Sequence, residues 1–190
     1  AYDDQGRLIH APWFDAENKK EDMLRLQDWP LDSIQLAQWR GLLFAAFDPV
    51  EPLQEQLGDT VSELVDEPLE EFSIVHSERL VFAANWKVYT DNFVEGYHIP
   101  GIHRDFFAAI NFNKFETSVH NNLVRMTAPP RAGLFYRGKW LWMWSNWTLS
   151  LFDGGMNTSR INPLSPDRTE LVYHFYFANS IATVSYTHLR

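Results

Sequence analysis

The chain of 190 residues contains no cysteine. This absence excludes disulfide bonds, zinc sites with thiolate ligands, cysteine nucleophiles and any iron–sulfur cluster that cysteines of this chain would hold. A chain without disulfide bonds fits a reducing compartment, and we expect a cytoplasmic protein.

Long apolar runs and an excess of basic residues are also missing. The run from Gly41 to Phe47 is far shorter than the roughly 20 apolar residues that cross a bilayer, so we expect no membrane insertion. Lys and Arg number 16 against 25 Asp and Glu, which gives a formal net charge of −9. Nucleic-acid phosphates would repel such an acidic chain, and we expect no nucleic-acid partner.

The hydrophobic content and its patterning predict a folded domain. Hydrophobic residues make up 45% of the chain and charged residues 22%, which is typical of a globular protein. Alternation of apolar and polar residues predicts strands, and helical periodicity predicts two helices between them. Together they predict an α+β fold in which a curved antiparallel sheet wraps around one principal helix. The predicted strands are 39–47, 72–84, 123–127, 139–151, 156–164 and 170–178, and the predicted helices are 52–65 and 85–99.

Both ends of the chain indicate a fragment of a longer protein. The residues around Gly6 favour a turn, and the strand that begins at Leu8 would need a partner before residue 1. At the other end, the strand that ends at Ala178 is followed by no predicted helix that could cover the sheet. We therefore expect residues 1–35 to be a remnant and linker, and residues 36–190 to be the main domain, incomplete at its C-terminal end.

Three polar side chains lie on the second predicted helix, which Asn85 could cap at its N-terminus. Asp91, Glu95 and His98 are spaced i, i+4 and i+7, so they would share one face. On a continuous helix, His103 would be rotated by about 140° from His98. Both imidazoles could bind one metal ion only if the helix breaks between them.

The Pro100-Gly101 pair predicts that break. His98 would then lie at the helix C-terminus, where the free carbonyl groups favour a nearby cation. Two neutral imidazoles on adjoining elements, joined by a carboxylate from elsewhere, are the ligands of a 2-His-1-carboxylate iron site with open positions. By itself the spacing is a weak motif, and two ordinary surface or core histidines are the alternative interpretation.

The residues around the two histidines carry a longer signature. The string reads Asn-Trp-Lys at 85–87, Asp-Asn-Phe at 91–93 and Glu-x-Tyr-His at 95–98, with a second His at 103. It closely resembles the iron-binding signature in catalytic alpha subunits of Rieske-type non-haem iron oxygenases, which include the aromatic-ring-hydroxylating dioxygenases. The resemblance implies a helix-grip, START-like catalytic domain. It also makes residues 1–35 the edge of a Rieske domain and its linker.

The same resemblance implies an oxidoreductase, a mono- or dioxygenase that hydroxylates an aromatic or other organic substrate. Such enzymes use mononuclear Fe(II), O₂ and electrons from a reductase or ferredoxin. They are usually homotrimers in which the [2Fe-2S] Rieske cluster of one subunit faces the iron of the next. By resemblance, His98 and His103 would bind the iron, and Glu95 would link the iron site to the neighbouring cluster. Asp91 and Asn92 would order the helix beside the iron.

Two departures from the family pattern limit what this chain could do alone. The cysteine ligands of a Rieske cluster are absent. The family's third iron ligand, an Asp on a C-terminal helix, would lie beyond residue 190, so we expect this chain by itself to be inactive. Asp105, Asp153 and Asp167 are local substitutes, although Asp153 and Asp167 lie in predicted turns.

Apolar residues close to the predicted ligands are candidates for a substrate pocket. Trp142 alternates with Trp140 and Trp144 along a predicted strand, so the three rings would share one side of the sheet. They are either core residues or the wall of a pocket for an aromatic ring or a quaternary ammonium group. The other pocket candidates are Phe93, Val94, Phe106 and Phe107.

Three functions stay open at this point. The first is oxygenation of an aromatic or other organic substrate. The second is a monooxygenase of the same family that acts on a quaternary ammonium compound similar to choline or carnitine. The third is a metal-free module that binds a hydrophobic ligand inside the same fold. Such a module has no need of Glu95, His98 and His103, which therefore discriminate it from the oxygenases.

Overall fold

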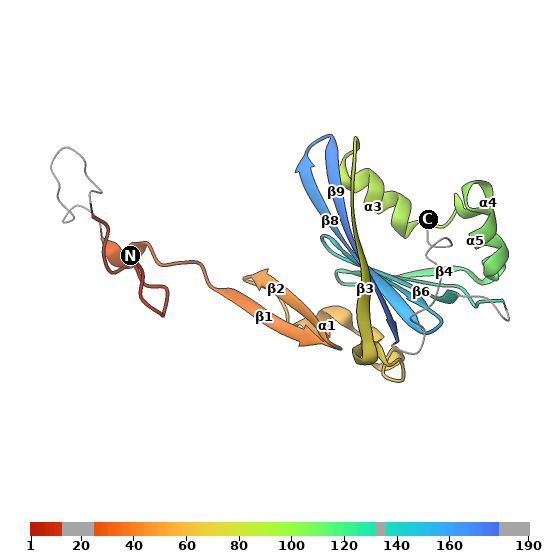
Figure 1. The fold of residues 1–190 in the computed structure, drawn as a ribbon, viewed down its shortest axis with the longest axis horizontal. Coiled ribbons are helices and arrows are strands. Elements are labelled where there is room, and N and C mark those ends of the chain that lie inside the picture. Colours follow the sequence, from red (N-terminus) through yellow and green to blue (C-terminus); the bar gives the residue numbers. More distant parts are fainter. Residues whose placement is uncertain (13–24, 132–135, 179–190) are drawn as a thin grey trace. The chain divides into compact units, whose positions relative to one another are not determined.

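The computed structural model describes residues 1–12, 25–131 and 136–178 (Figure 1). The chain divides into two compact units, Ala1–Leu53 and Gln54–Arg190. The assignment of residues 1–35 to a remnant and linker, and of residues 36–190 to the main domain, stays a prediction.

The first unit contains a two-stranded antiparallel sheet where a single strand, 39–47, was predicted. Strand β1, Ile34–Trp39, pairs with strand β2, Leu42–Phe47. Between them, Arg40 and Gly41 have φ angles of 49° and 81°, as in the two-residue type I′ turn of a β-hairpin. The prediction was wrong because an Arg in the left-handed region is uncommon and periodicity alone does not reveal it.

The first residues of the chain pair with one another. Tyr2 forms an antiparallel bridge with Leu8. The Asp3 carboxylate accepts hydrogen bonds from the backbone N–H groups of Gln5 at 3.0 Å and Arg7 at 2.8 Å. The expectation that Leu8 needs a partner before residue 1 was therefore wrong, since Tyr2 is that partner. A short 3₁₀ turn, η2, follows at Leu26–Asp28.

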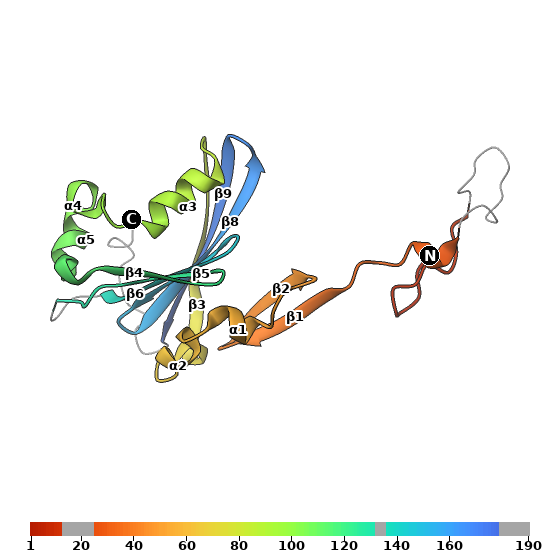
Figure 2. The same ribbon diagram turned by 180° about the vertical axis from the view of Figure 1, so that it is seen from behind.

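The second unit is built on a seven-stranded antiparallel sheet (Figure 2). Its strand order is β3-β9-β8-β7-β6-β5-β4. The predicted strand 139–151 is two strands, because Trp144 to Asn146 form a turn. The strands are β3 Phe72–Phe82, β4 Glu116–His120, β5 Leu123–Thr127, β6 Tyr136–Met143, β7 Trp147–Phe152, β8 Gly155–Ser165 and β9 Arg168–Ala178.

Short helices surround this sheet, and in the described part of the chain none of them is long and apolar enough to cross a membrane. The predicted helix 52–65 is broken at Gly58, which has a φ of 52°. A β-carbon at residue 58 would lie 2.5 Å from the ring of His120, so only glycine fits. The helices are α1 Leu53–Leu57, α2 Thr60–Glu63, α3 Trp86–Val94, α4 Ile99–Ile102 and α5 Arg104–Ala109, with 3₁₀ turns η3 Leu69–Glu71 and η4 Phe112–Lys114.

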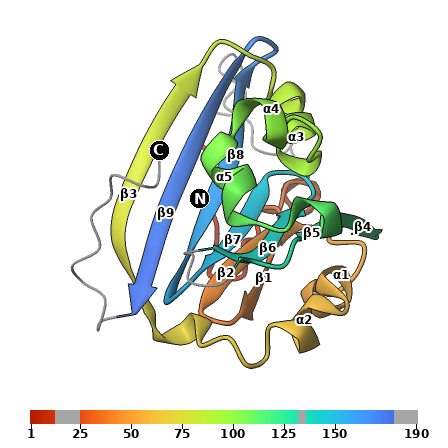
Figure 3. The ribbon, with the colours of Figure 1, turned by 90° about the vertical axis from the view of Figure 1, so that its right-hand side faces the viewer.

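Helix α3 packs on one face of the sheet, as Figures 1 and 3 show. The core beneath it is a cluster of Trp142, Ile161 and Leu171, which come from β6, β8 and β9. Apolar side chains of α3 cover this cluster and remove it from water, which is the main stabilising contribution to such an interface. The predicted α+β class, with an antiparallel sheet packed around a principal helix, is confirmed. The α3 residues in contact with the cluster are Trp86, Tyr89, Phe93 and Val94.

Candidate functional site

Helix α3 is held at its start by Asn85, as predicted. The Asn85 side chain accepts a hydrogen bond from the backbone N–H of Lys87 at 2.9 Å. Its amide group donates to the carbonyl oxygen of Pro166 at 2.6 Å, and the Thr169 hydroxyl donates to the carbonyl of Ala84 at 2.8 Å. These bonds tie the first turn of α3 to the β8–β9 turn.

Helix α3 ends at Val94, earlier than the predicted end at Ile99. Glu95 has extended backbone angles, with φ −98° and ψ 150°. The next residue, Gly96, is buried under Phe115, and a β-carbon there would lie 2.5 Å from that ring. The chain leaves the helix where it passes this ring, a tertiary contact that periodicity does not encode.

The early end of α3 changes the geometry of the predicted polar stripe. Asp91 stays in the last turn of α3 and is exposed. Glu95 and His98 lie beyond the helix, so the three side chains do not share one helix face. The prediction from the i, i+4, i+7 spacing was therefore wrong.

The break between the two histidines also differs from the prediction. His98 is the N-cap residue of α4, and Pro100 and Gly101 lie inside that short helix. Proline is tolerated in the first turn of a helix, because the N–H it lacks would have no partner there. His103 lies between α4 and α5. The predicted break at Pro100-Gly101 was wrong, and His98 does not lie at a helix C-terminus.

The chain nevertheless brings the two imidazoles together. The ring centroids of His98 and His103 are 5.0 Å apart, with an angle of 74° between the ring planes. The His98 side chain is 16% exposed, and the His103 residue is more open to solvent. One half-buried and one exposed imidazole therefore lie side by side, before and after one helical turn.

Glu95 holds the His98 imidazole on one side. Its Oε1 contacts Nδ1 of His98, and its Oε2 accepts a hydrogen bond from the His98 backbone N–H at 3.3 Å. The Asn92 amide nitrogen lies 3.5 Å from the same Nδ1. A metal-binding histidine typically donates its second ring N–H to a carboxylate, which selects the tautomer. With Nδ1 occupied, Nε2 is the His98 nitrogen left for a metal ion.

The donor set matches part of an iron site. Two close imidazoles, one oriented by a carboxylate, fit the histidine part of a 2-His-1-carboxylate centre. Within 1–12, 25–131 and 136–178, no group of three or more His, Asp or Glu side chains converges on one point. Of the possible substitutes, Asp153 lies 3.8 Å from Arg137, and Asp167 accepts a hydrogen bond from Ser165 at 2.6 Å. The family's third ligand beyond residue 190 stays a prediction.

The predicted pocket residues other than Phe107 belong to two adjoining core clusters. Phe93 and Val94 contact both clusters, the one around Trp142 and a second one around Trp140. Phe106 lies edge-on against Trp140, with ring centroids 5.1 Å apart. On the same helix, Phe107 packs on Phe112 at 5.4 Å. The second cluster consists of Ile110, Met126, Ala128 and Trp140.

The three alternating tryptophans do not form one wall. Trp140 and Trp142 are buried, whereas Trp144 is 56% exposed in the turn after β6. The Trp144 ring lies edge-on to Trp86 at 5.6 Å and to Trp142 at 5.8 Å. The prediction that all three share one side failed because the strand ends at Met143 and the alternation ends with it.

Sequence reasoning missed a line of buried hydroxyl groups beneath α3. The hydroxyl oxygens of Tyr89 and Tyr173 are 2.6 Å apart, and those of Thr148 and Ser159 are 2.5 Å apart. Ser159 lies opposite Thr148 on β7 and opposite Tyr173 on β9. We call these four residues the hydroxyl row. Burial raises the pKa of both tyrosines, so both stay protonated at neutral pH. Only the strand register could have revealed the row.

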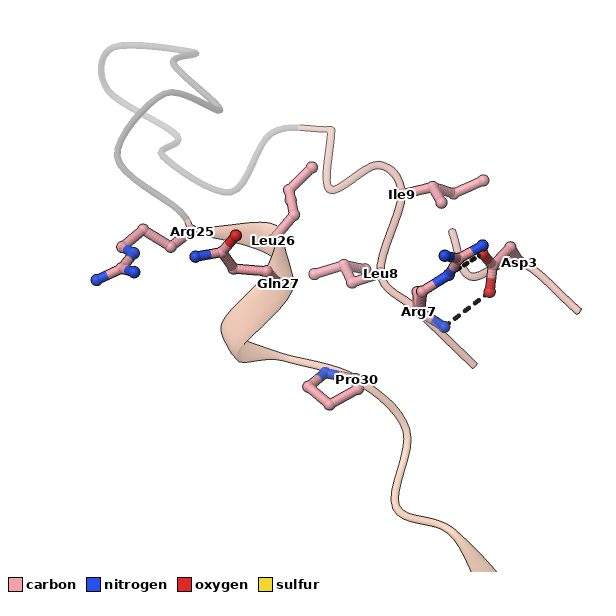
Figure 4. Close-up of a pocket in the computed structure, with 8 residues that line it drawn as sticks. All are labelled: Asp3, Arg7, Leu8, Ile9, Arg25, Leu26, Gln27 and Pro30. Carbon is pink, nitrogen blue, oxygen red and sulfur yellow. Dashed lines mark hydrogen bonds and ion pairs between the residues drawn. The ribbon is translucent and has the colours of Figure 1, made fainter. Parts of the chain in front are cut away.

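The first unit contains a hollow of about 610 Å³ (Figure 4). Its charged groups are already paired, Arg7 with Asp3 at 2.7 Å and Arg25 with Asp28 at 3.3 Å. These ion pairs reach the solvent, and the side chains that line the hollow do not form a pattern typical of a catalytic or metal-binding site. It is lined by Asp3, Arg7, Leu8, Ile9, Arg25, Leu26, Gln27 and Pro30.

Comparison with known proteins finds similarity over the segment that carries this geometry. Residues 69–145, which include both histidines, match the family model described as ring hydroxylating alpha subunit (catalytic domain). Choline monooxygenase of Spinacia oleracea is 22% identical over 185 residues, covering 87% of this chain and 41% of the relative. The alpha subunit of toluate 1,2-dioxygenase of Pseudomonas putida is 30% identical over 104 residues, covering 52% and 23%. The chain spans less than half the length of either relative.

Solved structures show the same fold. The quaternary ammonium Rieske monooxygenase CntA in complex with L-carnitine matches with a TM-score of 0.64 at 19% identity, covering 92% of this chain and 48% of that one. Naphthalene 1,2-dioxygenase from Rhodococcus sp. matches with a TM-score of 0.56 at 21% identity, covering 94% and 52%. The segment with the paired histidines is therefore similar to the catalytic domain of ring-hydroxylating alpha subunits, and the sheet around α3 has the fold of Rieske oxygenase catalytic domains.

Proposed function

We propose that this chain is the iron-binding part of an oxygenase. In the whole protein, it would hydroxylate an aromatic or other organic substrate with O₂ and electrons from a reductase or ferredoxin. The observation that carries the proposal is the pair of imidazoles, His98 and His103, with ring centroids 5.0 Å apart and with Glu95 on the first of them. A metal-free ligand-binding module has no need of this arrangement.

The proposed roles follow from the contacts of each side chain. His98 and His103 would hold Fe(II) through ring nitrogens, and bound iron would supply open coordination positions for O₂ and substrate. Glu95 fixes the tautomer and the ring orientation of His98. Asn92 is placed to support the same ring at 3.5 Å. Asp91, exposed and one turn earlier, acts at most through its charge.

The Glu95 side chain has a second proposed role. It is 24% exposed, so part of it stays accessible beside the half-buried His98. We infer that this edge faces the [2Fe-2S] Rieske domain of a neighbouring subunit in a homotrimer of the whole protein. Inter-subunit electron transfer is described for a quaternary ammonium Rieske monooxygenase of the same fold. A cytoplasmic location is part of the proposal and rests on the lack of cysteine.

Apolar side chains beside the histidines would exclude water from the reaction. Phe93 and Val94 immediately precede Glu95 and contact both core clusters. Phe106 and Phe107 lie on α5, which begins at the residue after His103. Exclusion of water strengthens the electrostatic interactions inside a site and suppresses side reactions.

A quaternary ammonium substrate is the second candidate. Relatives named choline monooxygenase and carnitine monooxygenase match most of this chain. The exposed ring of Trp144 and the ring of Trp86 beside it could attract a cation through their π faces. The Lys87 ammonium group already lies 5.9 Å from the Trp86 ring centroid, which supports the affinity of this ring for a positive charge.

Anaerobic titration of the full chain with Fe(II) in a calorimeter tests the proposal. We expect one Fe(II) per chain and its loss in His103→Ala. His120→Gln is the matched control, because it removes an exposed imidazole on β4 and should leave binding unchanged. Equal binding by wild type and His103→Ala would refute the site. Absence of binding in both would favour a metal-free module, unless a chain extended past residue 190 restores binding by adding the third ligand.

A further inference from the structure

Two buried polar atoms under α3 have no hydrogen-bond partner among the residues that the structure describes. They are Oγ1 of Thr90 and Nε1 of Trp142. Thr90 is 6% exposed and Trp142 is 8% exposed. Buried polar atoms without a partner are rare in folded proteins, and each one calls for an explanation.

The two atoms belong to opposite sides of one interface. Thr90 lies on α3, between Trp86 and Phe93 in the sequence and on the same helical face. Trp142 lies on β6, and both Trp86 and Phe93 pack against its cluster. The helix therefore contributes the unpaired hydroxyl to the α3–sheet interface, and the sheet contributes the unpaired indole N–H.

The polar groups around this region are satisfied, which sets the two atoms apart. Thr148, the cross-strand neighbour of Trp142, hydrogen-bonds Ser159 at 2.5 Å. Tyr89, next to Thr90, hydrogen-bonds Tyr173 at 2.6 Å. The hydroxyl row thus pairs its members with one another and leaves the indole N–H and the Thr90 hydroxyl available.

We propose that Thr90 and Trp142 form a polar subsite that binds a neutral oxygen of an organic ligand, such as a hydroxyl or carbonyl oxygen. The indole N–H is a donor only, and the threonine hydroxyl can donate or accept, so an acceptor oxygen is the ligand atom that suits both groups. The side chains packed around Trp142 are aromatic and aliphatic, and an ionised carboxylate would be costly to bury among them. The subsite therefore selects an oxygen that is uncharged.

The position of the subsite connects it to the proposed iron site, and its role in substrate choice rests on that proposed function. Phe93 and Val94 pack on the Trp142 cluster, and Val94 directly precedes Glu95. A ligand held by Thr90 and Trp142 would lie on the sheet side of the helix that leads to His98. The substrate class is then an organic molecule with a hydroxyl or carbonyl oxygen rather than a plain hydrocarbon.

The first test measures the metal-free chain without ligand. Thr90→Val replaces the unpaired hydroxyl by a methyl group of similar size, so its Tm should rise by roughly 2 to 4 °C. Tyr89→Phe is the matched control, because it removes a buried hydroxyl that is already paired and should lower the Tm. A lower Tm for Thr90→Val would mean that the hydroxyl is already bonded, for example to an ordered water, and would overturn the proposal.

The second test compares benzyl alcohol with toluene, which share a ring and differ in one hydroxyl group. Calorimetry on the metal-free chain should give tighter binding of benzyl alcohol. Thr90→Val and Trp142→Phe should each weaken benzyl alcohol binding by about three- to ten-fold and leave toluene unchanged. No preference in the wild type, or an equal loss for both probes, would overturn the proposal. Neither test needs iron, so a failure of the Fe(II) titration is a separate result.

Discussion

Glu95 offers the sharpest test of how the site is organised. It contacts His98 twice, through the backbone N–H at 3.3 Å and through Nδ1 of the ring. Carboxylates that orient a metal-bound histidine typically contribute 10–100-fold in metal affinity, or about 1.4–2.8 kcal/mol. Glu95→Ala removes both contacts, and we expect a loss of Fe(II) affinity near 100-fold.

Glu95→Gln separates geometry from charge. The amide oxygen can still accept a hydrogen bond from the ring, but the bond is no longer charge-assisted. Charge-assisted bonds exceed neutral ones by about 1 to 1.5 kcal/mol, so we expect roughly a ten-fold loss for this variant. The assay is anaerobic Fe(II) calorimetry on the full chain, repeated at two ionic strengths.

Asp91→Asn provides the matched control for this experiment. It removes one negative charge, one helical turn before Glu95, from an exposed side chain. We expect a change in Fe(II) affinity of less than about two-fold at physiological ionic strength, because screening weakens the effect of exposed charges. Equal losses in Asp91→Asn and Glu95→Gln would refute our reasoning, since the net charge and not the His98 contact would then explain the effect.

Two further predictions concern the frame that supports the site. Asn85→Ala removes both the α3 cap and the bond to Pro166, so urea unfolding should show a free energy of unfolding that is lower by about 1.5 to 3 kcal/mol. Asn85→Asp keeps the cap and should lower the free energy of unfolding by only about 1 kcal/mol. Equal losses in the two variants would contradict this account. The Glu170 carboxylate accepts a hydrogen bond from Asn162 and pairs with Arg79, and these contacts lower the pKa of Glu170. The contribution of Glu170 to stability is therefore fully present above the usual carboxyl pKa and is lost as the pH falls through the lowered pKa. Titration by NMR should show that pKa rising toward normal in Asn162→Ala, and an unchanged pKa would disprove the assignment.

Patterns local in the chain determined much of the sheet and the start of the helix. Alternation predicted the strands that became β3, β5, β8 and β9, and the last three of these place buried side chains in the core. The cap at Asn85 was also predictable, since an N-cap depends on residues within one turn of it. Each of these features involves neighbours in sequence.

Features that depend on distant residues were misplaced. The end of α3 was predicted five residues late, at Ile99 instead of Val94, because Gly96 passes under the ring of Phe115. The helix predicted over 52–65 breaks at Gly58, against the ring of His120 on β4. In both places, a ring from another element occupies the space that a continuing helix with side chains would need.

The candidate site divides in the same way. The sequence by itself determined which residues are the candidates, His98 and His103 with Glu95 three residues before the first of them. Only the tertiary structure decided that α3 ends before His98, that the single turn of α4 separates the two imidazoles, and that Glu95 is the carboxylate in contact with His98. It also decided which hydroxyls meet under α3, because strand register is set by pairing across the sheet and not by the residues of one strand.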